Sequence, residues 1–154
     1  MVLNKYLLAG FGLFLYLSQA VAGEVSISDA WARATAPGQD SATVALHITS
    51  QKEASIIAVS SAVAKTVEIH SMTHENGMMK MRALETFPLK AKHEVALGSD
   101  GNHIMLVGLK KQLNAGDSLI LNLTLQFADK HKETIEVKAA VKPMSEQHED
   151  SIQY

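Results

Sequence analysis

Hydrophobic and polar residues alternate along most of the chain after residue 23, with a period of two. The clearest stretch covers residues 119–127, in which every second residue is Leu or Phe. Alternation of this kind is typical of a strand with one buried face. We expect further strands, on the same pattern, at residues 25–32, 42–49, 54–60, 66–71, 78–84, 94–97, 103–109 and 134–141.

Turn-forming residues separate these stretches, and no stretch of useful length has the period of a helix. The dipeptide Asn76-Gly77 between two expected strands is a strong signal for a tight hairpin. Many short strands at this spacing indicate a sandwich or barrel. The sequence therefore predicts an all-β fold, an antiparallel β-sandwich or barrel.

The two ends of the chain differ from this pattern. Residues 1–22 have a basic start, an apolar run and the small residues Ala20 and Ala22 before Gly23, which is the layout of a cleaved secretory signal peptide. An uncleaved N-terminal anchor is the alternative. The polar residues 143–154 are expected to form a flexible tail. We therefore expect an exported, periplasmic domain over residues 23–142, monomeric and without membrane contact in its mature form.

Composition removes several classes of function. The formal net charge of −2 argues against a nucleic-acid-binding protein, which usually carries a basic surface. The chain has no Cys, so thiol nucleophiles, disulfide exchange and metal–thiolate sites are excluded. No Ser lies in a recognisable nucleophile elbow. We expect a protein that is not an enzyme.

Methionine and histidine are concentrated in one part of the sequence. Five of the seven Met and four of the seven His lie between His70 and Met105. Strand parity places His70 away from the core, and places His103 and Met105 together on one face. Met79 and Met81 share a face across the hairpin from His70. Thioether and imidazole are neutral, and thioether is a soft ligand that selects Cu(I), so this set is typical of a copper carrier.

The spacing of four of these residues resembles a known signature. Ten residues separate His70 from Met81, twenty-one separate Met81 from His103, and one separates His103 from Met105. This is similar to the His-x10-Met-x21-His-x-Met pattern of the PCu(A)C family of periplasmic copper chaperones. Further similar stretches are Val67-Glu-Ile-His70, Gly77-Met-Met-Lys-Met-Arg82, His103-Ile-Met-Leu-Val-Gly-Leu109 and Asp29-Ala-Trp-Ala-Arg33.

The resemblance covers about residues 25–141 and implies an antiparallel β-sandwich, with a cupredoxin-like or immunoglobulin-like Greek key, that binds Cu(I). It implies that His70, Met81, His103 and Met105 are the metal ligands. It further implies delivery of the copper ion to the dinuclear copper centre of cytochrome c oxidase, whose subunit II would be the accepting protein.

Several alternatives stay open from the residues alone. The Met/His face can instead be an adaptable protein-interaction surface, or the protein can be a general copper scavenger or tolerance protein. The copper donor and acceptor are unassigned. Trp31 is expected to anchor the core. Other residues with open or solvated roles are Met72, His74, Met78 and Met79 in the cluster, Met144 and His148 in the tail as possible Cu(II) ligands, and His47, His93 and His131 at polar or exposed positions.

Overall fold

The computed structural model describes residues 23–98 and 101–144, and this part of the chain consists of strands and turns. The expected signal peptide and most of the expected tail, including His148, lie outside the described residues. The strands are β1 (Val25–Arg33), β2 (Ser41–Ser50), β3 (Ala54–Ser60), β4 (Ala64–Glu75), β5 (Met78–Leu84), β6 (Phe87–Leu89), β7 (Glu94–Leu97), β8 (Asn102–Leu109), β9 (Ser118–Phe127) and β10 (Lys132–Lys142).

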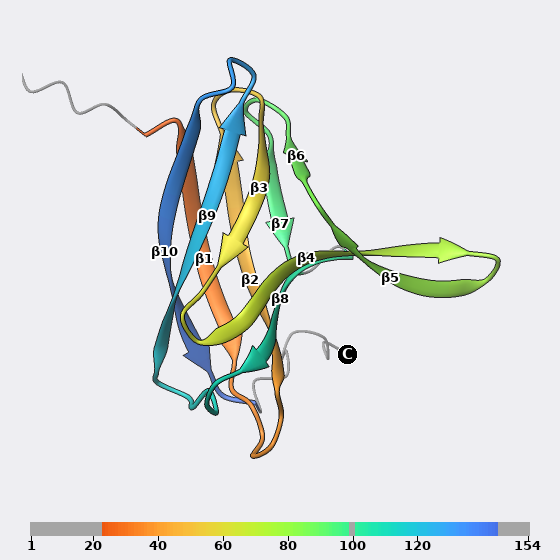
Figure 1. Cartoon of the computed structure of the whole chain (residues 1–154), viewed down its shortest axis with the longest axis vertical. Helices are drawn as coiled ribbons and strands as arrows, with labels where there is room; N and C mark the ends of the chain where they lie inside the picture. Colours follow the sequence, from red (N-terminus) through yellow and green to blue (C-terminus); the bar gives the residue numbers. More distant parts are fainter. Residues whose placement is uncertain (1–22, 99–100, 145–154) are drawn as a thin grey trace, which may run out of the picture.

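The strands form one continuous sheet in the order β5-β4-β8-β2-β1-β10-β9-β3-β6, and β7 also pairs with β2. All pairings are antiparallel except that of β1 with β10. The sheet folds over so that β3 and β9 lie in front of β1 and β2 (Figure 1). The predicted all-β, antiparallel-dominated fold is confirmed, with the parallel β1–β10 pair joining its two layers.

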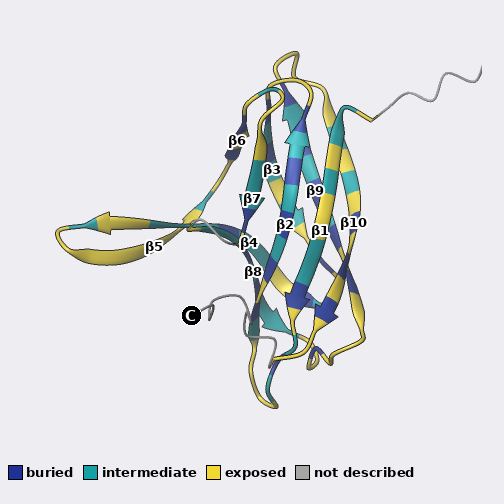
Figure 2. Ribbon diagram, turned by 180° about the vertical axis from the view of Figure 1, so that it is seen from behind, coloured by how far each residue is buried: buried dark blue, intermediate teal, exposed yellow. Residues whose placement is uncertain are grey.

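The alternating side chains meet in a single core between the layers. Leu121, Leu123 and Leu125 of β9 are fully buried, as are Leu46 and Ile48 of β2. Each such side chain contributes about 1.5–3 kcal/mol relative to an exposed position. The ribbon coloured by burial shows this alternation along β2 and β9 (Figure 2). Within residues 23–98 and 101–144, no helix is long and apolar enough to cross a membrane.

Two local features differ from the sequence prediction. The structure adds the strand β6, which the sequence did not predict. Three residues are too few to show an alternating pattern, and the central Pro88, which lacks a backbone N–H donor, argues against a strand. Trp31 is only partly buried and lies outside the core, so the prediction that it anchors the core is wrong. The cause is a register shift between Ser28 and Trp31, where Asp29 adopts a positive φ of 51° and alters the parity of β1.

The hairpin of β4 and β5 projects from the sandwich as an arm (Figures 1 and 2). We call residues 71–82 the arm. β4 is longer than the expected strand at residues 66–71 and continues through the arm to Glu75. The base of β4 pairs with β8, whereas its outer part pairs only with β5. Of the candidate ligands, Met81 lies in the arm, and His70, His103 and Met105 lie at its base.

Candidate functional site

His70 and His103 lie directly opposite each other on the neighbouring strands β4 and β8. Their ring centroids are 5.6 Å apart and the rings meet edge to face. Ile69 and Ile104, the adjacent residues in the two strands, point into the core. Strand parity therefore turns both imidazoles to the outer face, as the sequence predicts.

Met105 follows His103 by two residues and shares its face of β8. It pairs across the strands with Glu68 of β4 on one side and with Thr43 of β2 on the other. The Thr43 hydroxyl donates to the Met105 sulfur at 3.8 Å. This contact holds the thioether on the same surface as the two imidazoles.

Met81 lies one strand further out, on β5 of the arm. It pairs directly with Met72, and its neighbour Ala83 pairs with His70, so Met81 is diagonal to His70 on the same face. The strand β4 lies between Met81 and His103, and the Met81 side chain is 48% exposed. The structure thus brings His70, His103 and Met105 together, with Met81 at the edge of this group.

The surroundings of His70 prepare one ring nitrogen for a ligand. Its Nε2 lies 2.7 Å from Oε2 of Glu68, while its Nδ1 is buried and has no hydrogen-bond partner among the described residues. A tautomer that donates Nε2–H to Glu68 leaves a lone pair on Nδ1. This carboxylate–histidine arrangement is the usual support of a metal-ligating imidazole. The orphaned nitrogen fits a copper ligand better than a structural hydrogen bond.

His103 is favoured in its neutral form. The pKa of His103 is lowered from its ordinary value of 6.5, first by burial and second by the charge of His70. A neutral imidazole is the form that binds a metal. His103 therefore offers an uncharged nitrogen donor at neutral pH.

A groove of about 410 Å³ opens beside Met105. Thr43 and Met144 contribute to its lining, and Trp31 forms part of its wall, with Arg33 and Lys142 placed over the indole ring at 5.7 and 4.9 Å. The sequence analysis assigned Trp31 to the core and considered Met144 only as a possible Cu(II) ligand of the tail. Only the folded arrangement of β10, β1, β2 and β8 brings these residues to Met105.

The other residues of the sequence cluster occupy two faces of the arm. Met72, His74 and Met79 share the face of Met81, whereas Met78 lies on the opposite face. Outside the arm, His93 is exposed, and His47 of β2 contacts Glu94 of β7 at 3.1 Å. Neither of these two histidines lies next to a methionine in the sheet register.

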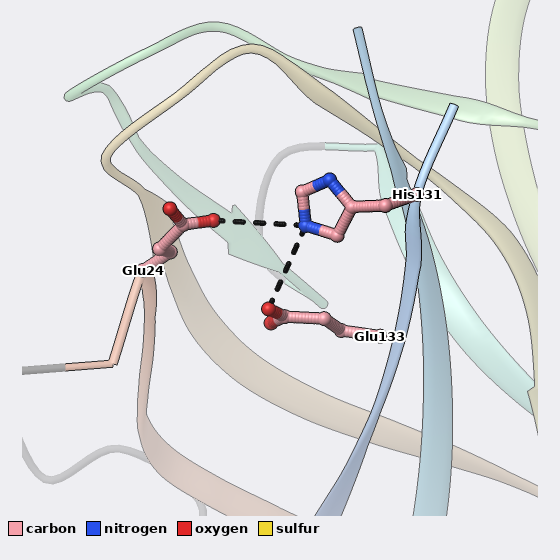
Figure 3. A group of neighbouring side chains, drawn as sticks. All are labelled: Glu24, His131 and Glu133. Atoms are coloured by element: carbon pink, nitrogen blue, oxygen red, sulfur yellow. Dashed lines mark ion pairs between the residues drawn. The ribbon is translucent and has the colours of Figure 1, made fainter. Parts of the chain in front are cut away.

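A second group of histidine and carboxylates lies at the β9–β10 hairpin (Figure 3). Nε2 of His131 is 3.9 Å from Oε2 of Glu24 and 3.7 Å from Oε1 of Glu133. The ligand atoms of all three residues lie within 4.8 Å of one another. Sequence reasoning expected a solvated tip at His131 and missed this group, because Glu24 is distant in the chain.

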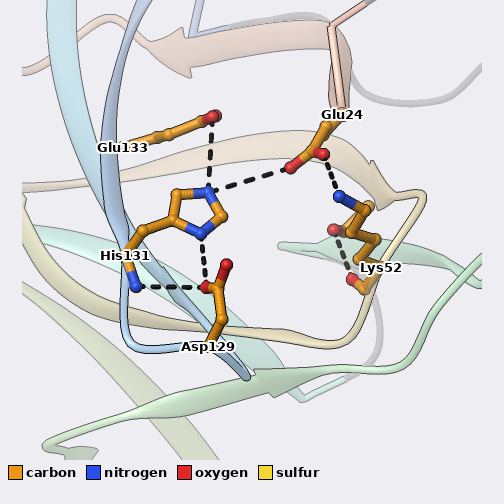
Figure 4. A network of polar contacts seen from close by, with 6 residues as sticks. Glu24, Lys52, Asp129, His131 and Glu133 are labelled. Carbon is orange, nitrogen blue, oxygen red and sulfur yellow. Dashed lines mark hydrogen bonds and ion pairs between the residues drawn. The ribbon is translucent and has the colours of Figure 1, made fainter.

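Each side chain of this group already has an ion-pair or hydrogen-bond partner within the protein (Figure 4). Lys52 pairs with Glu24, and Asp129 holds Nδ1 of His131. The Asp129 hydrogen bond raises the pKa of His131, and the same bond lowers the pKa of Asp129. We therefore interpret this group as an ion-pair network rather than as part of the site on β4, β5 and β8.

Comparison with solved structures defines the class of domain. The solution structure of CuI-DR1885 from Deinococcus radiodurans has a TM-score of 0.59 and 27% identity, over 81% of this chain and 83% of that one. The copper-bound PCuAC domain from PmoF2 has a TM-score of 0.57 and 24% identity, over 79% and 94%. The apo PCuAC domain from PmoF1 has a TM-score of 0.62 and 20% identity, over 79% and 95%. The fold is that of a PCuAC domain.

Sequence comparison identifies the family. The family described as "Putative lipoprotein LpqE-like" matches residues 25–141, and the chain belongs to this LpqE-like family. A curated relative, "Putative lipoprotein Lxx21020" from Leifsonia xyli subsp. xyli, is 31% identical over 106 residues. That alignment covers 68% of this chain and 63% of the relative, so the chain spans less than two thirds of the relative's length.

Proposed function

We propose that the protein is an exported copper carrier that binds one Cu(I) ion through His70, Met81, His103 and Met105. The observation that carries this proposal is the pair of outward-facing imidazoles on β4 and β8, in which Glu68 holds Nε2 of His70 and leaves its buried Nδ1 without a hydrogen-bond partner among the described residues. Two relatives of the same fold are described as copper-bound or as carrying CuI, which supports copper as the cargo.

The donor set explains the choice of metal and oxidation state. Neutral nitrogen and sulfur donors leave Cu(I) with its single positive charge, and soft thioethers favour Cu(I) over Zn(II) or Mg(II). Binding requires no deprotonation of a thiol, so protons compete mainly at the two imidazoles. The site therefore suits loading and release by exchange of ligands.

Exposure suits transfer to another protein. Met81 is about half exposed on the arm, and Met105 borders an open groove. An acceptor can therefore replace one thioether at a time without unfolding the sandwich. We propose that the acceptor is a copper protein of the same compartment, with the dinuclear centre in subunit II of cytochrome c oxidase as the specific candidate. Scavenging for copper tolerance would use the same ligands.

The test is a Cu(I) titration of the purified protein, without oxygen and against the chelator bicinchoninate. Replacing Met81 and Met105 by Leu keeps the hydrophobic volume and removes both sulfurs. We expect this double variant to lose about 100-fold or more in Cu(I) affinity, because two of the four ligands are gone.

Met78→Leu is the matched control, since Met78 lies on the same strand but on the opposite face of the arm. It should change the affinity of the site by no more than about twofold. Equal affinity in the double variant and in the parent protein would exclude the proposed ligand set. Equal thermal stabilisation of the parent protein by Zn(II) would exclude the soft-ligand argument.

A further inference from the structure

The arm exposes more methionine than any other described element of the fold. Met78, Met79 and Met81 are 61%, 57% and 48% exposed, and they are three of the five large exposed hydrophobic side chains among the described residues. Exposed apolar side chains that gather on one element point to a binding role. The position of these residues in the hairpin shows which of them can act together.

The turn at the tip fixes the register of the arm. Asn76 and Gly77 have φ values of 52° and 76°, as a two-residue turn of type I′ requires. Glu75 and Met78 flank the turn and pair with each other, so that His74 pairs with Met79 and Met72 with Met81. Since side chains alternate between faces, these two pairs lie on one face, one pair directly beyond the other.

Both pairs are of the kind in which side chains approach most closely. The backbone N–H of Met72 donates to the Gly101 carbonyl at 2.8 Å, so it points to β8 and away from β5. Met72 and Met81 therefore form a non-hydrogen-bonded pair, with Cα atoms about 4.5 Å apart. His74 and Met79 form the next pair of this kind, because the pattern repeats every two residues.

The opposite face of the arm has a different chemistry. There Glu75 binds Arg82 at 2.8 Å and Lys80 at 3.1 Å, so the only carboxylate of the arm is held by two cations. The face with Met72, His74 and Met79 carries no charged side chain within the arm. The ion pairs thus stabilise the hairpin from one side and leave a neutral set of soft donors on the other.

We propose that this face of the arm is a second Cu(I) site, formed by Met72, His74 and Met79, with Met81 as a ligand shared with the site at His70 and His103. Two soft thioethers and an imidazole, which also suits copper, match the preference of Cu(I). An ion bound near the tip can move to the base as Met81 exchanges one set of partners for the other. No electron moves in this exchange, because the ion stays Cu(I). Binding at the arm is independent of the proposed function, whereas the passage to the base rests on it.

The experiment counts Cu(I) ions and identifies their ligands. The protein is labelled at its methionine methyl groups and titrated with Cu(I), without oxygen, against bicinchoninate while the methyl resonances are followed by NMR. We expect two equivalents to bind, one shifting the Met105 resonance and the other shifting those of Met72 and Met79. The double variant His74→Gln with Met79→Leu should bind one equivalent and keep the Met105 shift.

Two further variants separate this proposal from the proposed function. Met78→Leu, which changes an equally exposed Met on the opposite face, should still bind two equivalents. His103→Gln with Met105→Leu should lose the equivalent at the base and keep the shifts of Met72 and Met79; this result would support the arm site even if the base site had another role. A parent protein in which Cu(I) leaves the Met72 and Met79 resonances unshifted, or unchanged binding in the His74 and Met79 double variant, would overturn the proposal and leave the arm as a contact surface.

Discussion

Histidine occurs in two clusters of this protein, and its neighbours give it opposite properties. At the β4–β8 pair, burial and a second imidazole lower the pKa of His103. At the β9–β10 hairpin, a hydrogen bond to Asp129 raises the pKa of His131. The first environment favours a neutral ring beside thioethers, and the second favours a protonated ring among carboxylates. The neighbours of each imidazole, more than the imidazole itself, therefore suit His103 to its proposed metal-binding role and His131 to ion pairing.

The strongest way to break this comparison is to remove one histidine from each cluster. His103→Gln should reduce Cu(I) affinity about 100-fold or more, because it removes a proposed ligand. His131→Gln should leave Cu(I) affinity within about twofold, since its cluster offers oxygen donors and no sulfur. Both affinities can be measured by competition with bicinchoninate, with circular dichroism as a check that each variant is folded. A comparable loss of Cu(I) affinity in the His131 variant would place copper at the β9–β10 hairpin and contradict the proposed site.

A smaller effect is expected from the carboxylate beside His70. Glu68→Gln weakens the contact at Nε2 that fixes the ring, and we expect a 10- to 100-fold loss of Cu(I) affinity, as is usual for a group that supports a metal-ligating histidine. The Met methyl shifts on binding should stay those of the parent protein, because the ligands themselves are unchanged.

The matched control for this variant is Glu94→Gln. Glu94 contacts His47 at 3.1 Å, so the same kind of pair is altered at a place that has no thioether. This control should bind Cu(I) like the parent protein. If Glu68→Gln also bound Cu(I) with unchanged affinity, Glu68 would have no positioning role.

The sequence predicts much of the fold because most strands follow a simple alternation. The buried residues of β2 and β9 are those that an alternation with a period of two assigns to the core. The exceptions have local physical causes: Pro88 interrupts the short strand β6, and Asp29 changes the parity of β1 before Trp31. A three-residue strand and a bulge leave too little alternation to read.

The candidate site is predictable only in part. Parity correctly places His70 and His103 on outer faces, and the turn at Asn76-Gly77 is enough to align Met79 and Met81 with His74 and Met72. The adjacency of β4 and β8 is different, because it depends on contacts between segments distant in the chain. No periodicity shows which two strands will pair, so only the resemblance to a known family indicated that His70 and His103 belong together.

The residues that contact or border the site could not be identified from the sequence either. Glu68 lies two residues from His70 on the same face, which parity reveals, but its contact with the ring depends on side-chain conformation. Trp31 reaches the groove beside Met105 through the pairing of β1 with β2 and of β2 with β8, and Met144, which follows β10, also requires the pairing of β10 with β1. The link between Glu24 and His131 similarly requires the folded sandwich.

The smallest predicted effect concerns the ion-pair network and tests the second histidine environment, that of His131. The raised pKa of His131 contributes stability that is present below pH 6.5 and is lost as the pH rises through its folded pKa. The lowered pKa of Asp129 contributes stability that is present above pH 3.8 and is lost as the pH falls through its folded pKa. Both shifts describe the same His131–Asp129 pair, which therefore contributes its full stability between pH 3.8 and pH 6.5.

His131→Gln should therefore lower the melting temperature at pH 5 by about 2 °C, since exposed ion pairs contribute little, and should lower it less at pH 9. The measurement is thermal unfolding followed by circular dichroism across this range. His93→Gln is the control, because His93 is also exposed and its Nδ1 lies near a backbone carbonyl instead of a carboxylate. A drop that is equal at pH 5 and pH 9 would mean that His131 stabilises the hairpin by stacking on Phe127, whose ring lies 4.4 Å away, and that its charge has no part in it. The contrast between a neutral imidazole proposed to bind copper and a charged structural one would then rest on the β4–β8 pair alone.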